Sequence, residues 1–153
     1  MTGDGLPVQD DAIRKAYRDS HDGCELIRYF PREAQRRHYV QIRGVRHSVP
    51  ASAYGQHIHH CFAMGRQRWD RVWNLLHISR VVHDWCHAYP VAGRVLALHH
   101  KLRVGEWDEE NAVECLGFSP LGWVHGHKPD ASDPAVVWVV PYWEMLVREK
   151  GVA

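Results

Sequence analysis

Histidines gather in two short stretches in the middle of the chain. The segment QHIHHC (56–61) contains three of them, and the segment NLLHISRVVHDWCHAYP (74–90) contains three more. His83 and His87 are four residues apart, so both side chains project from one face of a helix, which is a common metal-binding geometry. Two or three imidazole ligands hold a divalent metal and leave coordination positions open for water and a substrate. This pattern predicts a catalytic metal site.

The neighbouring residues His59 and His60 are predicted to have different roles. Successive side chains of a strand point to opposite faces, so one of the pair would bind the metal and the other would serve another purpose. A neutral histidine beside a metal is suited to act as a general base, because its pKa lies close to neutral pH. Such a base needs a partner that fixes its orientation, and Asn74 is the candidate. His57 shares a strand face with His59 and is a reserve ligand.

A compact local unit must position these side chains. Segment 56–62 is expected to form a short strand, the Arg-rich segment 63–71 a loop, and segment 72–79 a second strand. Ser79 is placed to cap a helix that runs through RVVHDWCHAY (80–89). The order strand, loop, strand, helix therefore brings histidines of the first strand next to histidines of the helix.

Further elements are expected on both sides of this unit. In chain order, we predict helices over 10–20 and 31–44, a loop over 47–55, helices over 91–105 and 108–117, a loop over 118–134, a strand over 135–140 and a helix over 142–151. These elements would supply the hydrophobic core on which the histidine-bearing unit rests.

The spacing of the histidines and the asparagine resembles the signature of the HNH endonuclease family, whose fold is called the ββα-metal fold or His-Me finger. Thirteen residues separate His60 from Asn74, eight separate Asn74 from His83, and three separate His83 from His87. Residues 56–90 also look like the family motif, with HIHH, then an Arg-containing loop, then NLLHISRVVHDWCHAYP. The chain resembles the small phage-type members of the family. The resemblance implies an α+β fold with a ββα-metal core flanked by helices.

One departure from the family pattern concerns cysteine. Many members carry two C-x-x-C pairs that hold a structural zinc. Here Ser79 and Val82 stand at one expected pair, and segment 47–55 offers no cysteine for the other. The chain therefore resembles the branch without a zinc ribbon, and no structural zinc is expected.

The resemblance also implies a role for each matching residue. His60 would activate water for attack on a DNA phosphodiester bond, and Asn74 would orient it. The divalent metal would be Mg²⁺ or Mn²⁺, with Zn²⁺ or Ni²⁺ as alternatives that imidazole binds well. The metal ligands would be His59, His83 and His87, the last of which is alternatively a phosphate contact. Contacts to the DNA backbone would come from Arg66, Arg68 and Arg80.

The position of the motif suggests three parts within a chain of single-domain length. Residues 1–45 would form an N-terminal helical extension, and residues 46–105 would form the nuclease core. Residues 106–153 would form an acidic C-terminal extension that packs on the core.

Charge is distributed unevenly along the chain, whose net charge is +1. Residues 28–103 carry a net +10, whereas residues 1–27 carry −3 and residues 104–153 carry −6. Arginines outnumber lysines fifteen to four, and arginine suits bidentate contact with phosphate. DNA is therefore the expected partner, although a solvated basic face paired with the acidic tail would have the same composition.

Composition bears on compartment and on alternative functions. No apolar run approaches the roughly 20 residues of a membrane span, and the N-terminus lacks the features of a signal peptide, so we expect a cytoplasmic protein with no membrane partner. The four cysteines contain no C-x-x-C pair and are expected to be reduced. A homodimer, or a phage or bacterial partner protein, is an open alternative. The alternatives to a nuclease are a non-catalytic DNA-binding module of the same fold and a His-rich metal-binding protein.

Overall fold

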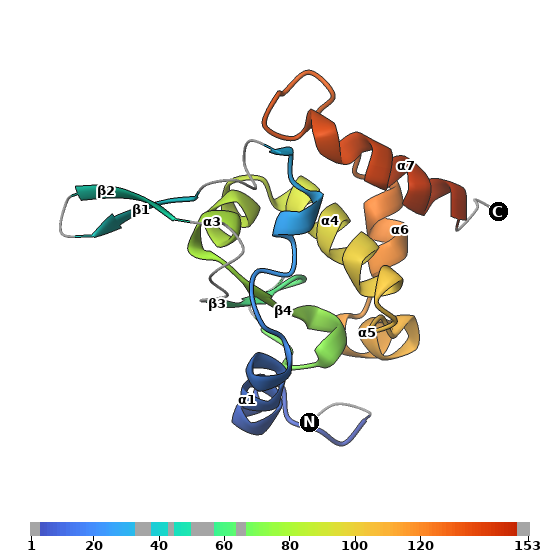
Figure 1. The fold of residues 1–153 in the computed structure, drawn as a ribbon. Helices are drawn as coiled ribbons and strands as arrows, with labels where there is room; N and C mark the ends of the chain where they lie inside the picture. The colour runs from blue at the N-terminus through green and yellow to red at the C-terminus, as the bar shows by residue number, and fades with distance from the viewer. Residues whose placement is uncertain (1–3, 33–37, 43–44, 50–56, 64–66, 150–153) are drawn as a thin grey trace.

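The computed structural model describes residues 4–32, 38–42, 45–49, 57–63 and 67–149, which belong to the α+β class. These residues contain six α-helices, two two-stranded antiparallel sheets and three short 3-10 turns. The elements are α1 (Asp11–Ser20), β1 (His38–Ile42), β2 (Val45–Val49), β3 (His57–His60), β4 (Leu75–Ile78), α3 (Arg80–Ala88), α4 (Pro90–Arg103), α5 (Glu109–Leu116), α6 (Pro120–His125) and α7 (Val140–Glu149), with 3-10 turns at Ile27–Tyr29, Val72–Asn74 and Val137–Val139 (Figure 1). None of the helices within these ranges is both long and apolar enough to cross a membrane.

The hairpin of β3 and β4 leads directly into α3. The strands pair so that His59 lies opposite Leu76 and His60 opposite Leu75. All of β4 is buried, whereas β3 is half-buried. Ser79 begins α3 as predicted, because its hydroxyl oxygen accepts a hydrogen bond from the backbone N–H of Val82 at 3.3 Å. The strand, strand, helix order predicted for this segment is therefore present, although the second strand is shorter than expected.

Helices α3 and α4 come into very close contact at Gly93. A Cβ atom built on Gly93 would lie only 3.2 Å from the Cα atom of Cys86 on α3. A methyl group at this position would therefore require the backbone of Cys86 to shift by a few tenths of an ångström. Tyr89 ends α3, and Pro90 begins α4 at the first helical position, where its missing N–H costs nothing.

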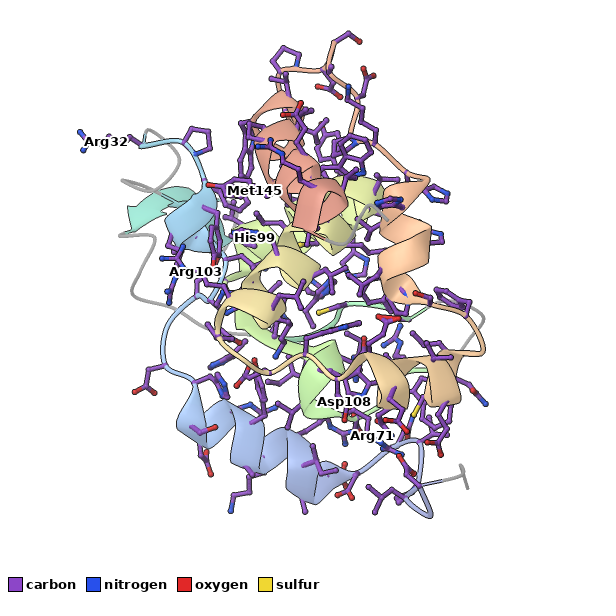
Figure 2. The ribbon with its side chains drawn as sticks, turned by 90° about the vertical axis from the view of Figure 1, so that its right-hand side faces the viewer. Arg32, Arg71, His99, Arg103, Asp108 and Met145 are labelled. Atoms are coloured by element: carbon purple, nitrogen blue, oxygen red, sulfur yellow. The ribbon has the colours of Figure 1, made fainter. Side chains whose placement is uncertain are left out.

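Helix α4 lies at the centre of the main hydrophobic core. Its residues Val95, Leu96 and Leu98 are completely buried. Helix α3 covers one side of α4, and α6 and α7 cover another (Figure 1). Side chains fill the space between these helices in the perpendicular view (Figure 2). This packing fixes α3 and the hairpin beneath it on a rigid base.

The N-terminal residues are integrated with the rest of the molecule. Leu26, Ile27 and Phe30 are buried in the same core cluster as α4. The Arg14 side chain of α1 forms an ion pair with Asp70, and the Arg71 guanidinium donates to both carboxylate oxygens of Asp4 at 3.0 and 3.1 Å. The loop before β4 is therefore held by the N-terminal segment.

Two predicted elements before β3 are wrong. The helix expected over 31–44 is replaced at 38–42 by strand β1, and the loop expected over 47–55 begins with the end of β2. The two strands form an antiparallel hairpin in which His38 pairs with Val49. Val, Ile and Tyr are frequent in segment 38–49 and favour an extended backbone. This preference overrides the Pro and Gly signals at the ends of the predicted helix. The extension predicted over 1–45 is therefore not wholly helical.

Two predictions in the C-terminal third are also wrong. The loop expected over 118–134 contains α6, whose N-cap Ser119 is followed by Pro120 in the manner of a helix start. The strand expected over 135–140 is a 3-10 turn that leads into α7. Val136 and Val139 are buried three residues apart, a helical spacing. The valines fill the core from a helical turn, which overrides their preference for strands.

Candidate metal centre

Three histidines from two elements meet on one side of the hairpin. His59 comes from β3, and His83 and His87 come from consecutive turns of α3. One ring nitrogen of each lies within 4.8 Å of the others, and the Nε2 atoms of His83 and His87 are 3.1 Å apart. These three side chains, here called the imidazole cluster, are the residues predicted as metal ligands. The ring of His57 stacks on that of His83 at 4.7 Å between centroids.

The surroundings of the imidazole cluster favour neutral rings. Burial, followed by the proximity of His83, His87, His60 and Arg94, lowers the pKa of His59 to about 3. Burial, followed by the proximity of His87 and His57, also lowers the pKa of His83. A histidine must be neutral to offer a nitrogen lone pair to a metal. Three adjacent neutral imidazoles fit a divalent transition metal.

A cavity of about 320 Å³ adjoins the imidazole cluster. Its lining includes His59, His60 and His87, and two arginines, Arg68 and Arg94, contribute positive charge. Space for a ligand therefore borders two of the candidate metal ligands and the predicted general base together.

The ring of His60 is held by a buried carboxylate. Its Nε2 atom lies 2.8 Å from Oδ1 of Asp70, whose side chain is fully buried. The other carboxylate oxygen of Asp70 accepts from the backbone N–H of Asp10 at 2.7 Å and from Arg14. With its proton on Nε2 and donated to Asp70, neutral His60 has its lone pair on Nδ1. This arrangement fixes one tautomer and leaves Nδ1 as the proton acceptor.

Asn74 fixes the chain that follows His60 and does not contact the ring. Its side-chain oxygen accepts from the backbone N–H of Phe62 at 2.7 Å, and its amide nitrogen donates to the carbonyl of Trp69 at 3.0 Å. Its own carbonyl accepts from the N–H of Cys61 at 2.8 Å. Asn74 therefore secures both ends of the loop between β3 and β4, and Asp70, not Asn74, is the partner of the His60 ring.

The three arginines predicted to touch DNA have different surroundings. Arg66 lies outside the described residues. Arg68 is exposed at the cavity, and Arg80 is exposed on α3, 4.0 Å from Asp84. Arg71 and Lys101 contribute to the net +10 of the middle segment but are buried and paired with acids. The net charge of the segment therefore overstates the charge available to a polyanion.

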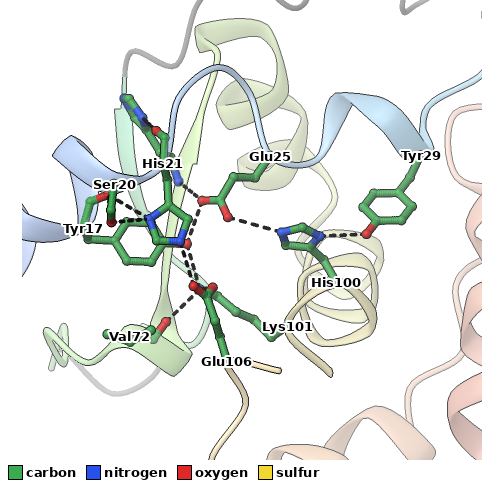
Figure 3. A network of polar contacts seen from close by, with 10 residues as sticks. Tyr17, Ser20, His21, Glu25, Tyr29, Val72, His100, Lys101 and Glu106 are labelled. Atoms are coloured by element: carbon green, nitrogen blue, oxygen red, sulfur yellow. Dashed lines mark hydrogen bonds and ion pairs between the residues drawn. The ribbon is translucent and has the colours of Figure 1, made fainter. Parts of the chain in front are cut away.

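A second group of potential ligands lies on the other side of β4, between α1 and α4. The side chains of His21, Glu25 and Glu106 also bring one ligand atom each within 4.8 Å of the others. The Lys101 ammonium already occupies this region, donating to Glu106 at 2.8 Å and to the Tyr17 hydroxyl at 2.8 Å (Figure 3). We call these five side chains, together with His100, the buried network.

Each carboxylate of the buried network has its partners inside the protein. Glu25 accepts from the Tyr17 hydroxyl at 2.7 Å and from the His77 backbone N–H at 2.6 Å, and it bonds the His100 ring at 3.2 Å. Burial alone would raise the pKa of Glu25, but these hydrogen bonds and the Lys101 charge hold it below its usual range. The buried network is therefore a satisfied ion-pair network built around a lysine.

Two residues of the centre were not predicted from the sequence. Asp70 is the single acid between His60 and Asn74, and that position was a signal that it partners the base. Arg94 lies about one turn into α4, the helix that follows α3, and no sequence motif identified it. Comparison with protein-family models, curated proteins and solved structures found no significant match.

Proposed function

We propose that this protein is a metal-dependent endonuclease that hydrolyses DNA phosphodiester bonds through a ββα-metal centre of the HNH type. The observation that carries the proposal is the meeting of the imidazole cluster, His60 and one cavity within a strand, strand, helix unit. The spacing of His60, Asn74, His83 and His87, which resembles the HNH signature, supports it independently.

His60 is the general base in this proposal. Its Nδ1 atom takes a proton from a water molecule in the cavity, so that the water oxygen can attack the phosphorus atom. The ring is positively charged after it takes the proton, and the buried carboxylate of Asp70 stabilises that charge at 2.8 Å. Asp70 is thus a positioning residue, and Arg14 holds it in place from α1.

His59, His83 and His87 would hold the divalent metal. When bound, it would supply positive charge that stabilises the negative charge developing on the phosphate and the leaving oxygen. All three ligands are nitrogens, whereas Mg²⁺ and Mn²⁺ prefer oxygen, so the ligand set favours Zn²⁺ or Ni²⁺. Mg²⁺ and Mn²⁺ remain predictions to be tested beside them.

A plasmid-cleavage assay tests the proposal. Supercoiled DNA is incubated with the metal-stripped protein and with Mg²⁺, Mn²⁺, Ni²⁺ or Zn²⁺ added in turn. We expect nicking that requires a metal and falls by about 10²–10⁴-fold in His60→Ala, the usual contribution of a general base. The exposed His125 of α6 offers a matched control, and His125→Ala should cleave like the wild type. Equal activity of His60→Ala and the wild type would contradict the proposed role.

A His-rich metal-binding protein without catalysis is the second candidate. The all-imidazole ligand set favours it, because such sets bind Zn²⁺ tightly without any need for a substrate. Zn²⁺ binding that requires His83 and His87, with no cleavage of several DNA forms, would support this candidate. DNA binding without cleavage, weakened by salt, would support a non-catalytic DNA-binding module.

A further inference from the structure

Arg94 stands out among the cations of the interior. It projects from α4 into the cavity that His59 and His87 also line. Its guanidinium carbon lies 4.9 Å from the centre of the Trp123 ring, and the side chain is half-buried. Within the described ranges, Arg94 forms no hydrogen bond and no ion pair, so its N–H donors have no protein acceptor there.

The other interior cations have acids as partners. Arg14 pairs with Asp70, Arg71 with Asp4, and Lys101 with Glu106. Removing a cation from water is unfavourable unless a counter-charge accompanies it, and burial accordingly lowers the pKa of Arg94. A half-buried guanidinium that faces a cavity without an acid therefore has unused capacity for an anion.

The contact with Trp123 leaves that capacity intact. An arginine stacked on an aromatic ring uses the face of its guanidinium plane, whereas its N–H groups point outward from the edge of the plane. The ring thus restrains the side chain while the donors stay available. Arg94 is also close enough to His59 for its charge to lower the pKa of that imidazole. The arginine charge and the candidate metal ligands therefore act on the same small volume.

We propose that Arg94 binds a phosphate group in the cavity, donating to its non-bridging oxygens beside the imidazole cluster. Arginine presents paired N–H donors that match two oxygens of a phosphate, and the site contains no acid that would repel the anion among the cavity-lining residues. The assignment rests on the proposed nuclease function for the identity of the ligand as a DNA phosphodiester. It adds an anion-binding residue that no sequence motif identified.

Binding of inorganic phosphate to the metal-free protein tests the proposal without any cleavage reaction. An NMR titration follows the tryptophan indole N–H signals of the wild type, Arg94→Met and Arg103→Met. Arg103, labelled in Figure 2, is the matched control. It lies on the same helix and also sits over an aromatic ring, Tyr29 at 6.0 Å, but it is not among the residues that line the cavity. We expect Arg94→Met to weaken phosphate binding at least about tenfold, the usual effect of losing a charge-assisted hydrogen bond, and Arg103→Met to leave it unchanged.

Three results would overturn the proposal: no phosphate binding by the wild type, equal binding by Arg94→Met, or equal weakening by Arg103→Met. Arg94→Gln serves the same purpose if the Met variant does not fold, as checked by its unfolding transition. Plasmid nicking measured in parallel separates the two proposals. If the wild type cleaves DNA but its phosphate binding does not depend on Arg94, the nuclease proposal stands and the anion-site proposal fails. Arg94-dependent phosphate binding without cleavage keeps the anion site and removes the nuclease.

Discussion

The imidazole cluster and the buried network have the same local geometry and opposite surroundings. Each brings three potential ligand atoms within 4.8 Å of one another. In the buried network, Lys101 and several hydrogen-bond donors already occupy the acceptors (Figure 3). In the imidazole cluster, within the described part of the chain, the rings form no hydrogen bond with a lysine or an acid, and the exposed Asp84 carboxylate lies 3.9 Å from Nδ1 of His83. A cavity adjoins His59 and His87.

The comparison shows that proximity of ligand atoms does not define a metal site. Lone pairs that already accept hydrogen bonds from a buried ammonium stabilise the fold and are not available to a metal. In the imidazole cluster, the His83 and His87 rings bond each other at 3.1 Å, a contact that a metal ion held by both nitrogens would replace. The buried network thus supports the fold, and the imidazole cluster is the region that we propose for a metal.

The largest expected effect comes from removing the cation of the buried network. Lys101→Met keeps the volume of the side chain and leaves the buried Glu25 and the half-buried Glu106 without their ammonium. Breaking a buried ion pair costs about 3–5 kcal/mol, so the free energy of unfolding in urea should fall by that amount. Arg103→Met, two residues further along α4 on an exposed side chain, should change it by less than about 0.5 kcal/mol. Similar values for the two variants would contradict the structural role of the network.

Added metal should distinguish the two groups directly. Zn²⁺ at one hundred times its dissociation constant should raise the free energy of unfolding by about 2.7 kcal/mol, because it binds the folded state. The increase should disappear in His87→Ala and persist in Glu106→Gln, whatever the starting stability of each variant. An increase that survives in His87→Ala but disappears in Glu106→Gln would place the metal in the buried network. Thermal or urea unfolding with and without Zn²⁺ provides the measurement.

The low pKa of His59 predicts a pH dependence of stability in the metal-free protein. The folded state keeps His59 neutral down to about pH 3, whereas the unfolded state takes up a proton below its usual pKa near 6.5. Stability is therefore lost as pH falls below 6.5, by at most about 1.4 kcal/mol per pH unit from this group. Urea unfolding between pH 6 and pH 5 should show a shallower loss for His59→Leu. An unchanged slope would show that His59 is protonated in the folded state.

Removal of the α3 cap should have the smallest effect. It should lower both the stability of the protein and the Zn²⁺ affinity of the imidazole cluster. Ser79→Ala leaves the N–H of Val82 without its acceptor and should reduce the free energy of unfolding by about 1 kcal/mol. Since His83 and His87 sit on this helix, Zn²⁺ affinity should fall with it. Ser119→Ala removes the equivalent cap of α6 and should lower stability without changing Zn²⁺ affinity.

The histidine-bearing unit was predictable because its signals are local. Ser79 marks the start of α3, and the four-residue spacing of His83 and His87 places both on one helix face. The short strand at 57–60 and the helix at 90–103 follow from periodicity and from proline and glycine positions. For such segments, the information that sets the structure lies within about ten residues.

The remaining features depend on contacts between distant segments. At 137–139 the valines favour a strand, but their burial in the core goes with a helical turn. At 38–42 the flanking Pro and Gly indicated a helix, whereas the segment pairs with 45–49 as a strand. The bond between His60 and Asp70 requires the loop to fold back under α1. The position of Arg94 over Trp123 depends on how α4 packs against α6. No sequence spacing identifies the contact of Arg94 with Trp123, and the local hint for His60 was that Asp70 is the single acid before Asn74.

The close approach of α3 and α4 at Gly93 controls the dimensions of the imidazole cluster. A methyl group at position 93 would require a shift of a few tenths of an ångström from the backbone of Cys86, the residue next to His87. Two of the three ligands would move with α3, while His59 would stay on its strand. Preferred metal–ligand distances differ by similar amounts among ions. For the metal centre that we propose, Gly93→Ala should therefore change the preference among ions of different radius while every ligand is kept.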